Sequence, residues 1–169
     1  MKRSVPRLLA AVAAIALAGC ASYRLGSTVP PALRTVSVPV FENASGQPEA
    51  ETIATRAVLR EFRRDGTMRI AAVEDAALKV VGRVTACSVT PLRFDRDQPH
   101  LALEYRLRLT ADVKVVETAT GKVLANLGPV SGESAFRTQA DEASSKRDAL
   151  PRAAHALAQA VVSGTVGAW

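Results

Sequence analysis

Cysteine and histidine are the side chains of this sequence best suited to covalent or acid–base chemistry, and there are two of each. Cys20 is the most informative, because Leu17-Ala18-Gly19-Cys20 ends an apolar run that begins at Leu8. Small residues directly before a cysteine are typical of bacterial lipoproteins, in which the chain is cut before the cysteine and its sulfur receives a diacylglycerol. We therefore expect signal cleavage between Gly19 and Cys20 and lipidation of the Cys20 sulfur.

The segment before Cys20 has the features of a signal peptide. Three basic residues precede the apolar run: Lys2, Arg3 and Arg7. The run is about half of the roughly 20 apolar residues that span a membrane, so residues 1–19 are predicted to be a signal peptide. Ala21 and Ser22 follow Cys20 where inner-membrane retention signals carry an aspartate. We therefore expect a lipid anchor in the outer membrane, with the domain on its periplasmic side.

The remaining reactive groups do not form a catalytic or metal site in the sequence. His155 is predicted on a solvated helix face and His100 in a polar loop. Cys87 has no histidine at a motif-like spacing and is predicted as a small residue on a half-exposed strand. No cluster has the spacing of metal ligands, and no glycine-rich turn suits a phosphate. We predict a protein that is not an enzyme and needs no metal or cofactor.

Charge argues against a nucleic-acid-binding protein, and cysteine content argues against a domain stabilised by disulfides. The chain has 22 basic and 16 acidic residues, but three of the basic ones lie in the predicted signal peptide. The remaining 19 basic residues barely exceed the acidic ones, which is not the footprint of a nucleic-acid-binding protein. With Cys20 lipidated, Cys87 is the only thiol, so no intrachain disulfide can form.

Periodicity places the elements of one domain. Residues 20–33 contain Gly26, Pro30 and Pro31 and are predicted to be a lipidated tether, and residues 34–169 a single domain. Apolar alternation predicts strands near 34–41, 68–73, 78–86 and 101–116, and a less regular one from about Lys122. Apolar stripes predict helices from about Pro48 to Asp65 and from a start between Asp141 and Pro151. This order favours an α+β, two-layer sandwich of about four to five mostly antiparallel strands, with both helices on one sheet face.

The stripes also assign faces. The first helix should bury Ala54, Thr55, Val58, Leu59 and Phe62; the second should bury Leu150, Ala153, Ala154, Leu157, Ala158, Val161 and Thr165. On the third strand, Cys87 is predicted on the polar face and Ala86 on the apolar face. The longest strand should bury every second residue from Leu101 to Val115. Its other face carries Arg106, Arg108 and Lys114. That charged face suits a hydrated lumen, and it equally suits a sheet face exposed to solvent.

Several segments, taken in order, resemble the family of lipopolysaccharide-assembly lipoproteins called LptE. They are Gly19-Cys20 with Tyr23-Arg24-Leu25-Gly26, TVSVPVFEN (35–43), REFRRDG (60–66), EYRLRLTADVKV (104–115), TGKVL (120–124), and ALPRA (149–153) with Trp169. The resemblance covers nearly all of the chain after the predicted signal peptide. It departs from the family at Ala21-Ser22, where a single glycine is common.

The resemblance implies a partner and a role. Members of the family form a one-to-one complex with the large β-barrel LptD, sit partly inside it as a plug, and assist the insertion of lipopolysaccharide into the outer leaflet. Within this interpretation, Arg106, Arg108 and Lys114 are candidate contacts for lipopolysaccharide. Arg106 and Arg108 point the same way and are about 7 Å apart, and an arginine fork suits phosphate oxygens.

Other envelope lipoproteins remain as alternatives. The VPVFEN strand followed by a helix also resembles CsgG-like secretion subunits and auxiliary lipoproteins of lipid ABC transporters. A CsgG-like pore would need long amphipathic membrane hairpins, and the sequence shows one long alternating run. An envelope hydrolase would need a clustered nucleophile and base, which the sequence does not show.

Overall fold

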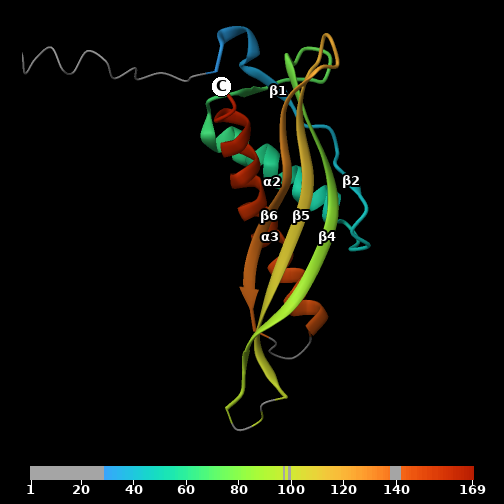
Figure 1. The fold of residues 1–169 in the computed structure, drawn as a ribbon, viewed down its shortest axis with the longest axis vertical. Coiled ribbons are helices and arrows are strands. Elements are labelled where there is room, and N and C mark those ends of the chain that lie inside the picture. Colours follow the sequence, from blue (N-terminus) through green and yellow to red (C-terminus); the bar gives the residue numbers. More distant parts are fainter. Residues whose placement is uncertain (1–28, 97, 99, 138–141) are drawn as a thin grey trace, which may run out of the picture.

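A mixed sheet covered on one face by two helices makes up the domain (Figure 1). The computed structural model describes residues 29–96, 98, 100–137 and 142–169. The strands are β1 (Thr35–Ser37), β2 (Glu42–Asn43), β3 (Arg69–Ile70), β4 (Leu78–Phe94), β5 (Ala102–Glu117) and β6 (Val123–Phe136). The helices are α2 (Ala50–Asp65) and α3 (Glu142–Val166), and a 3₁₀ turn, η2 (Pro31–Leu33), precedes β1. The α+β prediction is confirmed, with one strand more than the four to five expected.

The sheet combines two kinds of pairing. Its order is β3-β1-β4-β5-β6, and β2 pairs with β4 beside β1. The long strands β4, β5 and β6 are antiparallel to their neighbours, whereas β1, β2 and β3 pair in parallel. The predicted strand over 34–41 is interrupted: β1 ends at Ser37 and β2 begins at Glu42, with Pro39 between them. A proline has no backbone donor for a sheet ladder, which accounts for the break.

A β-bulge in β4 reverses the predicted faces of Ala86 and Cys87. The register of β4 against β5 shifts between Val84 and Ala86. One extra residue turns each following side chain to the opposite face. Ala86 is therefore exposed, and Cys87 pairs with Leu109 and packs against the core. The sequence prediction for both residues was wrong because strict alternation cannot anticipate a bulge.

Helix α2 is built largely as its sequence predicts. It begins at Ala50, two residues after Pro48, and ends at Asp65, followed by Gly66, whose φ of 72° supports the left-handed C-cap. The predicted stripe is buried except for Leu59, which is half-buried. The buried face is wider than predicted and also includes Ala57 and Glu61. The Glu61 carboxylate accepts a hydrogen bond from Arg64 at 2.9 Å.

Helix α3 begins at Glu142, so Pro151 lies inside it. The helix tolerates this proline on its exposed side, at the loss of one backbone hydrogen bond. All of the predicted stripe of α3 is buried. Gly132 of β6 allows the helix to approach closely, because a Cβ there would lie 2.1 Å from the carbonyl oxygen of Ala153. The helix therefore packs directly on the strand backbone at this point.

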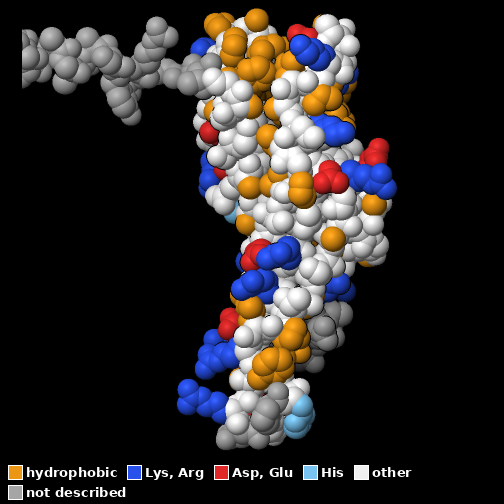
Figure 2. Space-filling view, in the orientation of Figure 1, with side chains coloured by type: hydrophobic (Ala, Val, Ile, Leu, Met, Phe, Trp, Pro, Cys, Tyr) orange, Lys and Arg blue, Asp and Glu red, His pale blue; other side chains and the backbone are white. Residues whose placement is uncertain are grey.

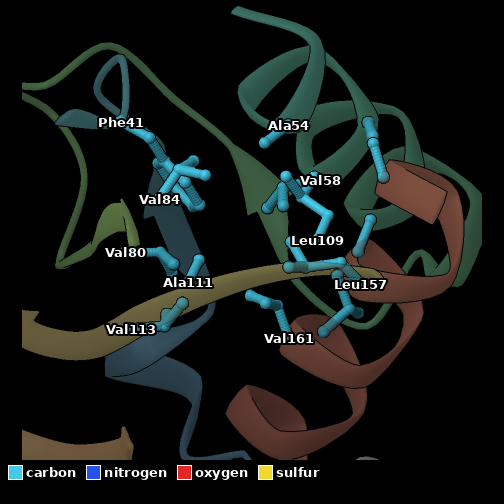
Figure 3. Close-up of a cluster of buried hydrophobic side chains, with 14 of the residues drawn as sticks. Phe41, Ala54, Val58, Val80, Val84, Leu109, Ala111, Val113, Leu157 and Val161 are labelled. Carbon is cyan, nitrogen blue, oxygen red and sulfur yellow. The ribbon is translucent and has the colours of Figure 1, made fainter. Parts of the chain in front are cut away.

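The core lies between the helices and the covered face of the sheet. Figure 3 shows side chains from both layers pointing toward one another, among them Val84, Leu109 and Val113 of the sheet and Val58 and Leu157 of the helices. All five are fully buried. Phe41, between β1 and β2, enters the same core, and its ring occupies the space that a side chain at Gly82 would fill.

The β4–β5 hairpin projects beyond the rest of the sheet (Figure 1). Strand β6 ends at Phe136, opposite Tyr105, and the two rings stack at 5.6 Å. Beyond this pair, four large apolar side chains are between 39% and 48% exposed: Leu92, Phe94, Leu101 and Leu103. The buried stripe predicted for β5 therefore stops short of Leu101 and Leu103, because neither a helix nor β6 extends over the projecting end.

Candidate functional site

The uncovered face of the sheet carries the predicted site residues. Leu107, Leu109, Ala111, Val113 and Val115 of β5 point into the core. The alternate residues of the strand therefore point away from the helices. Figure 2, in the orientation of Figure 1, shows basic and acidic side chains gathered in clusters on this face, separated by uncharged surface. Arg106, Arg108 and Lys114 thus share one face, as predicted, but the face is not uniformly basic.

Arg106 and Arg108 form one unit with an acidic residue of the neighbouring strand. Arg108 lies directly opposite Glu133 of β6. Its Nε donates a hydrogen bond to Glu133 Oε1 at 2.7 Å, and Arg106 Nε lies 3.2 Å from Oε2 of the same carboxylate. Each oxygen of Glu133 thus faces a different arginine. We call these three residues the arginine pair and its carboxylate.

This unit keeps one net positive charge at the surface. The side chains of Arg106 and Arg108 are 41% and 50% exposed, so much of each guanidinium remains open to solvent. A guanidinium has five N–H donors in a planar fork. The carboxylate engages the pair from the β6 side and leaves other donors available. The unit can therefore hold an anion, although more weakly than two unpaired arginines would.

Lys114 belongs to a different part of the same face. It is six residues from Arg108 along β5, a separation of about 20 Å, which is too far for both to contact one phosphate. Lys114 lines a hollow of about 560 Å³. Its lining includes Glu42 of β2, Arg83 of β4, Asp112 of β5 and Asn126 of β6.

The charges that line this hollow balance. Arg83 lies directly opposite Asp112 in the sheet, and its Nε is 3.9 Å from Glu42 Oε2. With Lys114, two basic residues face two acidic ones around the hollow. This lining suits contact with a polypeptide of mixed charge better than it suits a single anion. The structure therefore separates the three predicted contacts into a basic pair and a neutral hollow.

Glu133 is the residue of the candidate site that the sequence prediction missed. It is the single charged residue of β6. Nothing along the chain indicates which residue of β5 it faces, because that depends on the register between strands. The turn residues 118–121 predict that β5 and β6 form a hairpin, but they do not predict which residues pair across it.

The groups considered for catalysis do not come together. His100 and His155 are both exposed, His155 on α3 with its Nδ1 3.9 Å from Glu61 Oε2. Burial raises the pKa of the Cys87 thiol, while the positive charge of Lys146 opposes the shift. Among the described residues, no group of three or more His, Cys, Asp or Glu side chains is arranged to hold a metal ion. No described helix is long and apolar enough to cross a membrane.

The predicted cleavage and lipidation site, Gly19 and Cys20, lies outside the described residues. The domain that follows is a small α+β unit with one sheet face packed on helices and the other charged and open. Residues 33–164 match the family described as "LptE: Lipopolysaccharide-assembly". The chain belongs to this family, as the resemblance in its sequence predicted.

Two solved structures share the fold at low sequence identity, and a third is less similar. A protein from Xanthomonas campestris is 14% identical, with 82% of this chain and 90% of that chain aligned at a TM-score of 0.53. A hypothetical protein from Chlamydia trachomatis is 10% identical, with coverage of 79% and 95% and a TM-score of 0.52. A minor lipoprotein from Acinetobacter baumannii is 18% identical, with coverage of 80% and 92% and a TM-score of 0.45. Comparison with curated proteins gave no match.

Proposed function

We propose that this protein is a lipid-anchored component of lipopolysaccharide assembly at the outer membrane, where it partners an LptD-like β-barrel as a plug and assembly factor. The observation that carries the proposal is the family match over residues 33–164, which takes in both helices up to Gly164 and every described strand. The role is one of binding and positioning, without catalysis. The anchor is the diacylglycerol on Cys20, and the domain lies on the periplasmic side of the membrane.

The open sheet face suits the plug role physically. A domain inside a hydrated barrel needs a polar surface toward the lumen, and the arginine pair, its carboxylate and the neutral hollow provide one. The side chains of Arg83 and Glu42 are 60% and 73% exposed, so they can exchange contacts with water for contacts with the barrel wall. The hollow at Lys114 is the part of the face that we assign to the barrel.

The arginine pair is the part of the face that we assign to lipopolysaccharide phosphate. Arg106 and Arg108 are spaced about 7 Å apart, which lets each guanidinium reach a separate phosphate oxygen. Such an exposed contact weakens with salt, because the Debye length falls from about 10 Å at 0.1 M to about 3 Å at 1 M. Docking in the barrel through shape should depend less on salt.

The test separates the two partners. The double variant R106E/R108E should lose affinity for purified lipopolysaccharide and still copurify with the barrel from detergent-solubilised outer membrane. The matched control is R56E/R63E, which reverses two exposed arginines on α2, away from the sheet. Unchanged lipopolysaccharide binding in R106E/R108E would mean that the arginine pair is exposed to solvent and does not contact lipopolysaccharide. Failure of the wild-type protein to copurify with any barrel would remove the plug assignment itself.

A further inference from the structure

The neutral hollow on the open sheet face crosses four strands, because its lining comes from β2, β4, β5 and β6. A β-bulge shapes its β6 side. Asn126 and Gly128 pair with consecutive residues of β5, so Leu127 is an extra residue in β6. Gly128 has a φ of 65°, the left-handed conformation that such a bulge uses. Leu127 packs against the core, so the bulge turns this large side chain away from the hollow.

The floor of the hollow is apolar. Val81 of β4 is 44% exposed, and Pro129 of β6 is also exposed at the lining. Both side chains are compact, whereas those of Glu42, Arg83 and Lys114 are long and can extend beyond the floor as a charged rim. The volume of about 560 Å³ lies within the about 300–1,000 Å³ of pockets that hold small molecules, so a whole side chain fits. An apolar centre inside a polar rim is the anatomy of a protein–protein interface.

Two charges of the rim are available to a partner. Asp112 and Lys114 are exposed, and neither side chain forms an ion pair with another described residue. They are two residues apart on β5, so they lie on the same face about 7 Å from each other. Arg83 and Glu42 already face one another, with Nε and Oε2 3.9 Å apart. A partner can therefore form two new ion pairs, with a basic group at Asp112 and an acidic group at Lys114.

We propose that the hollow receives an apolar side chain of the LptD-like barrel, with a basic residue of the same barrel segment at Asp112 and an acidic residue at Lys114. The inference rests on the proposed function and deepens it, because it states the chemistry of the barrel segment that the plug recognises. The apolar side chain covers Val81 and Pro129. The two charges set the direction in which the segment crosses the sheet, since the reverse direction would place like charges together.

The balance of charges separates this contact from the one at the arginine pair. Arg83 and Lys114 are matched by Glu42 and Asp112, so the hollow has no net charge with which to attract an anion. Salt screens exposed ion pairs but does not screen the burial of apolar surface. We therefore expect barrel binding to depend on Val81 at every salt concentration, and on the two exposed charges mainly at low salt.

The role of the apolar floor is tested with two valines of similar exposure. The full-length tagged protein is isolated from detergent-solubilised outer membrane, and the barrel that copurifies is identified and quantified by mass spectrometry. V81D should lower the recovery of the barrel by about tenfold or more, because it places a charge at the centre of the contact, whereas V81L should retain it. V123D is the matched control, since Val123 is 47% exposed but lies at the start of β6, outside the hollow.

The role of the two charges is tested by exchanging them. D112K/K114D keeps the net charge of the face and reverses the order of the charges. It should lower the recovery of the barrel by about fivefold at 0.1 M salt and by less at 1 M salt. The control R147D/D148R exchanges two exposed charges on α3 and should have no effect. Circular dichroism establishes that each variant is folded.

A photocrosslinker identifies the occupant of the hollow. With p-benzoylphenylalanine in place of Val81, illumination should join the protein to the barrel. Mass spectrometry of the joined peptide should find an apolar residue at the crosslink and both an acidic and a basic residue in the same barrel segment. A product with lipopolysaccharide, or with a second copy of this chain, in place of the barrel overturns the proposal.

The outcomes distinguish this inference from the plug assignment on which it rests. If the wild type and V81D recover the barrel equally, the hollow is not the docking site and the plug assignment stands. Equal losses in V81D and V123D overturn the assignment of the contact to the hollow. Unchanged recovery in D112K/K114D overturns the role of the two charges. A wild-type protein that recovers no barrel overturns the plug assignment and this inference together.

Discussion

At the scale of single residues, Glu133 sets how strongly the arginine pair can hold an anion. It engages Arg106 with one carboxylate oxygen and Arg108 with the other. Its carboxylate occupies some of the guanidinium donors and offsets one of the two positive charges, so the donors that remain hold an incoming phosphate more weakly. Glu133 therefore lowers the affinity of the arginine pair for the proposed phosphate. A lower affinity favours reversible, short-lived binding.

Removing the negative charge of Glu133 should strengthen lipopolysaccharide binding. We expect E133Q to raise the affinity for purified lipopolysaccharide by up to about fivefold, because an exposed ion pair contributes about 0.2–1 kcal/mol. Titration of fluorescently labelled lipopolysaccharide at low salt measures the effect, and E74Q, which changes an exposed glutamate in the loop between β3 and β4, is the control. Equal affinities of E133Q and the wild type would contradict the role of Glu133 in weakening the contact.

Cys87 should be a poorly reactive thiol. Burial raises its pKa, with the charge of Lys146 acting in the opposite direction, so the neutral thiol predominates at pH 7. Alkylation by iodoacetamide at pH 7.5 should be slower in the folded protein than in urea, and the rate should rise with pH as thiolate forms. Mass spectrometry follows the reaction. Equal rates in the folded and unfolded protein would show that the thiol is not shielded.

At the scale of elements, the sequence predicts amphipathic faces well and departures from regularity poorly. The apolar stripes of α2 and α3 are buried nearly as expected. The period of a helix stays constant along its length, so no residue is shifted from one face to another. Strand β4 is different: the bulge after Val84 reverses the faces of Ala86 and Cys87. Its second half contains Pro91 and has no clear apolar alternation, so the sequence did not predict that the strand runs to Phe94. The pairing of Arg108 with Glu133 depends on inter-strand register, which one strand's sequence does not contain.

The helix faces can be checked by stability. L157A and F62A each remove a fully buried side chain, so each should lower the free energy of unfolding by about 2–5 kcal/mol through the cavity left behind. R63A and R152A, on the exposed sides of the same helices, should each change it by less than about 0.5 kcal/mol. Urea denaturation followed by circular dichroism measures all four. Similar losses in the two groups would mean that the faces are misassigned.

At the scale of the whole molecule, the domain is polarised along its length. One end holds the start of the described domain and the end of α3, the middle carries the charged sheet face, and the far end is the hairpin with four exposed apolar side chains. Each region is made by different residues, so a substitution can change the surface of one region without changing the others. A substitution in one region should leave binding by the other two intact when the core is preserved.

The mixed pairing of the sheet has a consequence for the order of folding. Strands β4, β5 and β6 are joined by short turns, with Phe94 paired to Ala102 and Val116 to Val123. Strand β1 instead pairs Val36 with Leu78, across more than forty residues. Closing a long loop costs more entropy than closing a short one, so the meander should form before β1 joins it.

Pulsed hydrogen exchange during refolding measures this order. Amides of β5 should gain protection before those of β1, and simultaneous protection would contradict the expected sequence of events. The consequence reaches export through the predicted signal peptide. If the proposed export runs from the N-terminus, the part of the domain that emerges first is the part that folds last, because β1 pairs with β4, whose own partner β5 lies further along the chain. We therefore expect the N-terminal third to stay unfolded until the long strands have followed it.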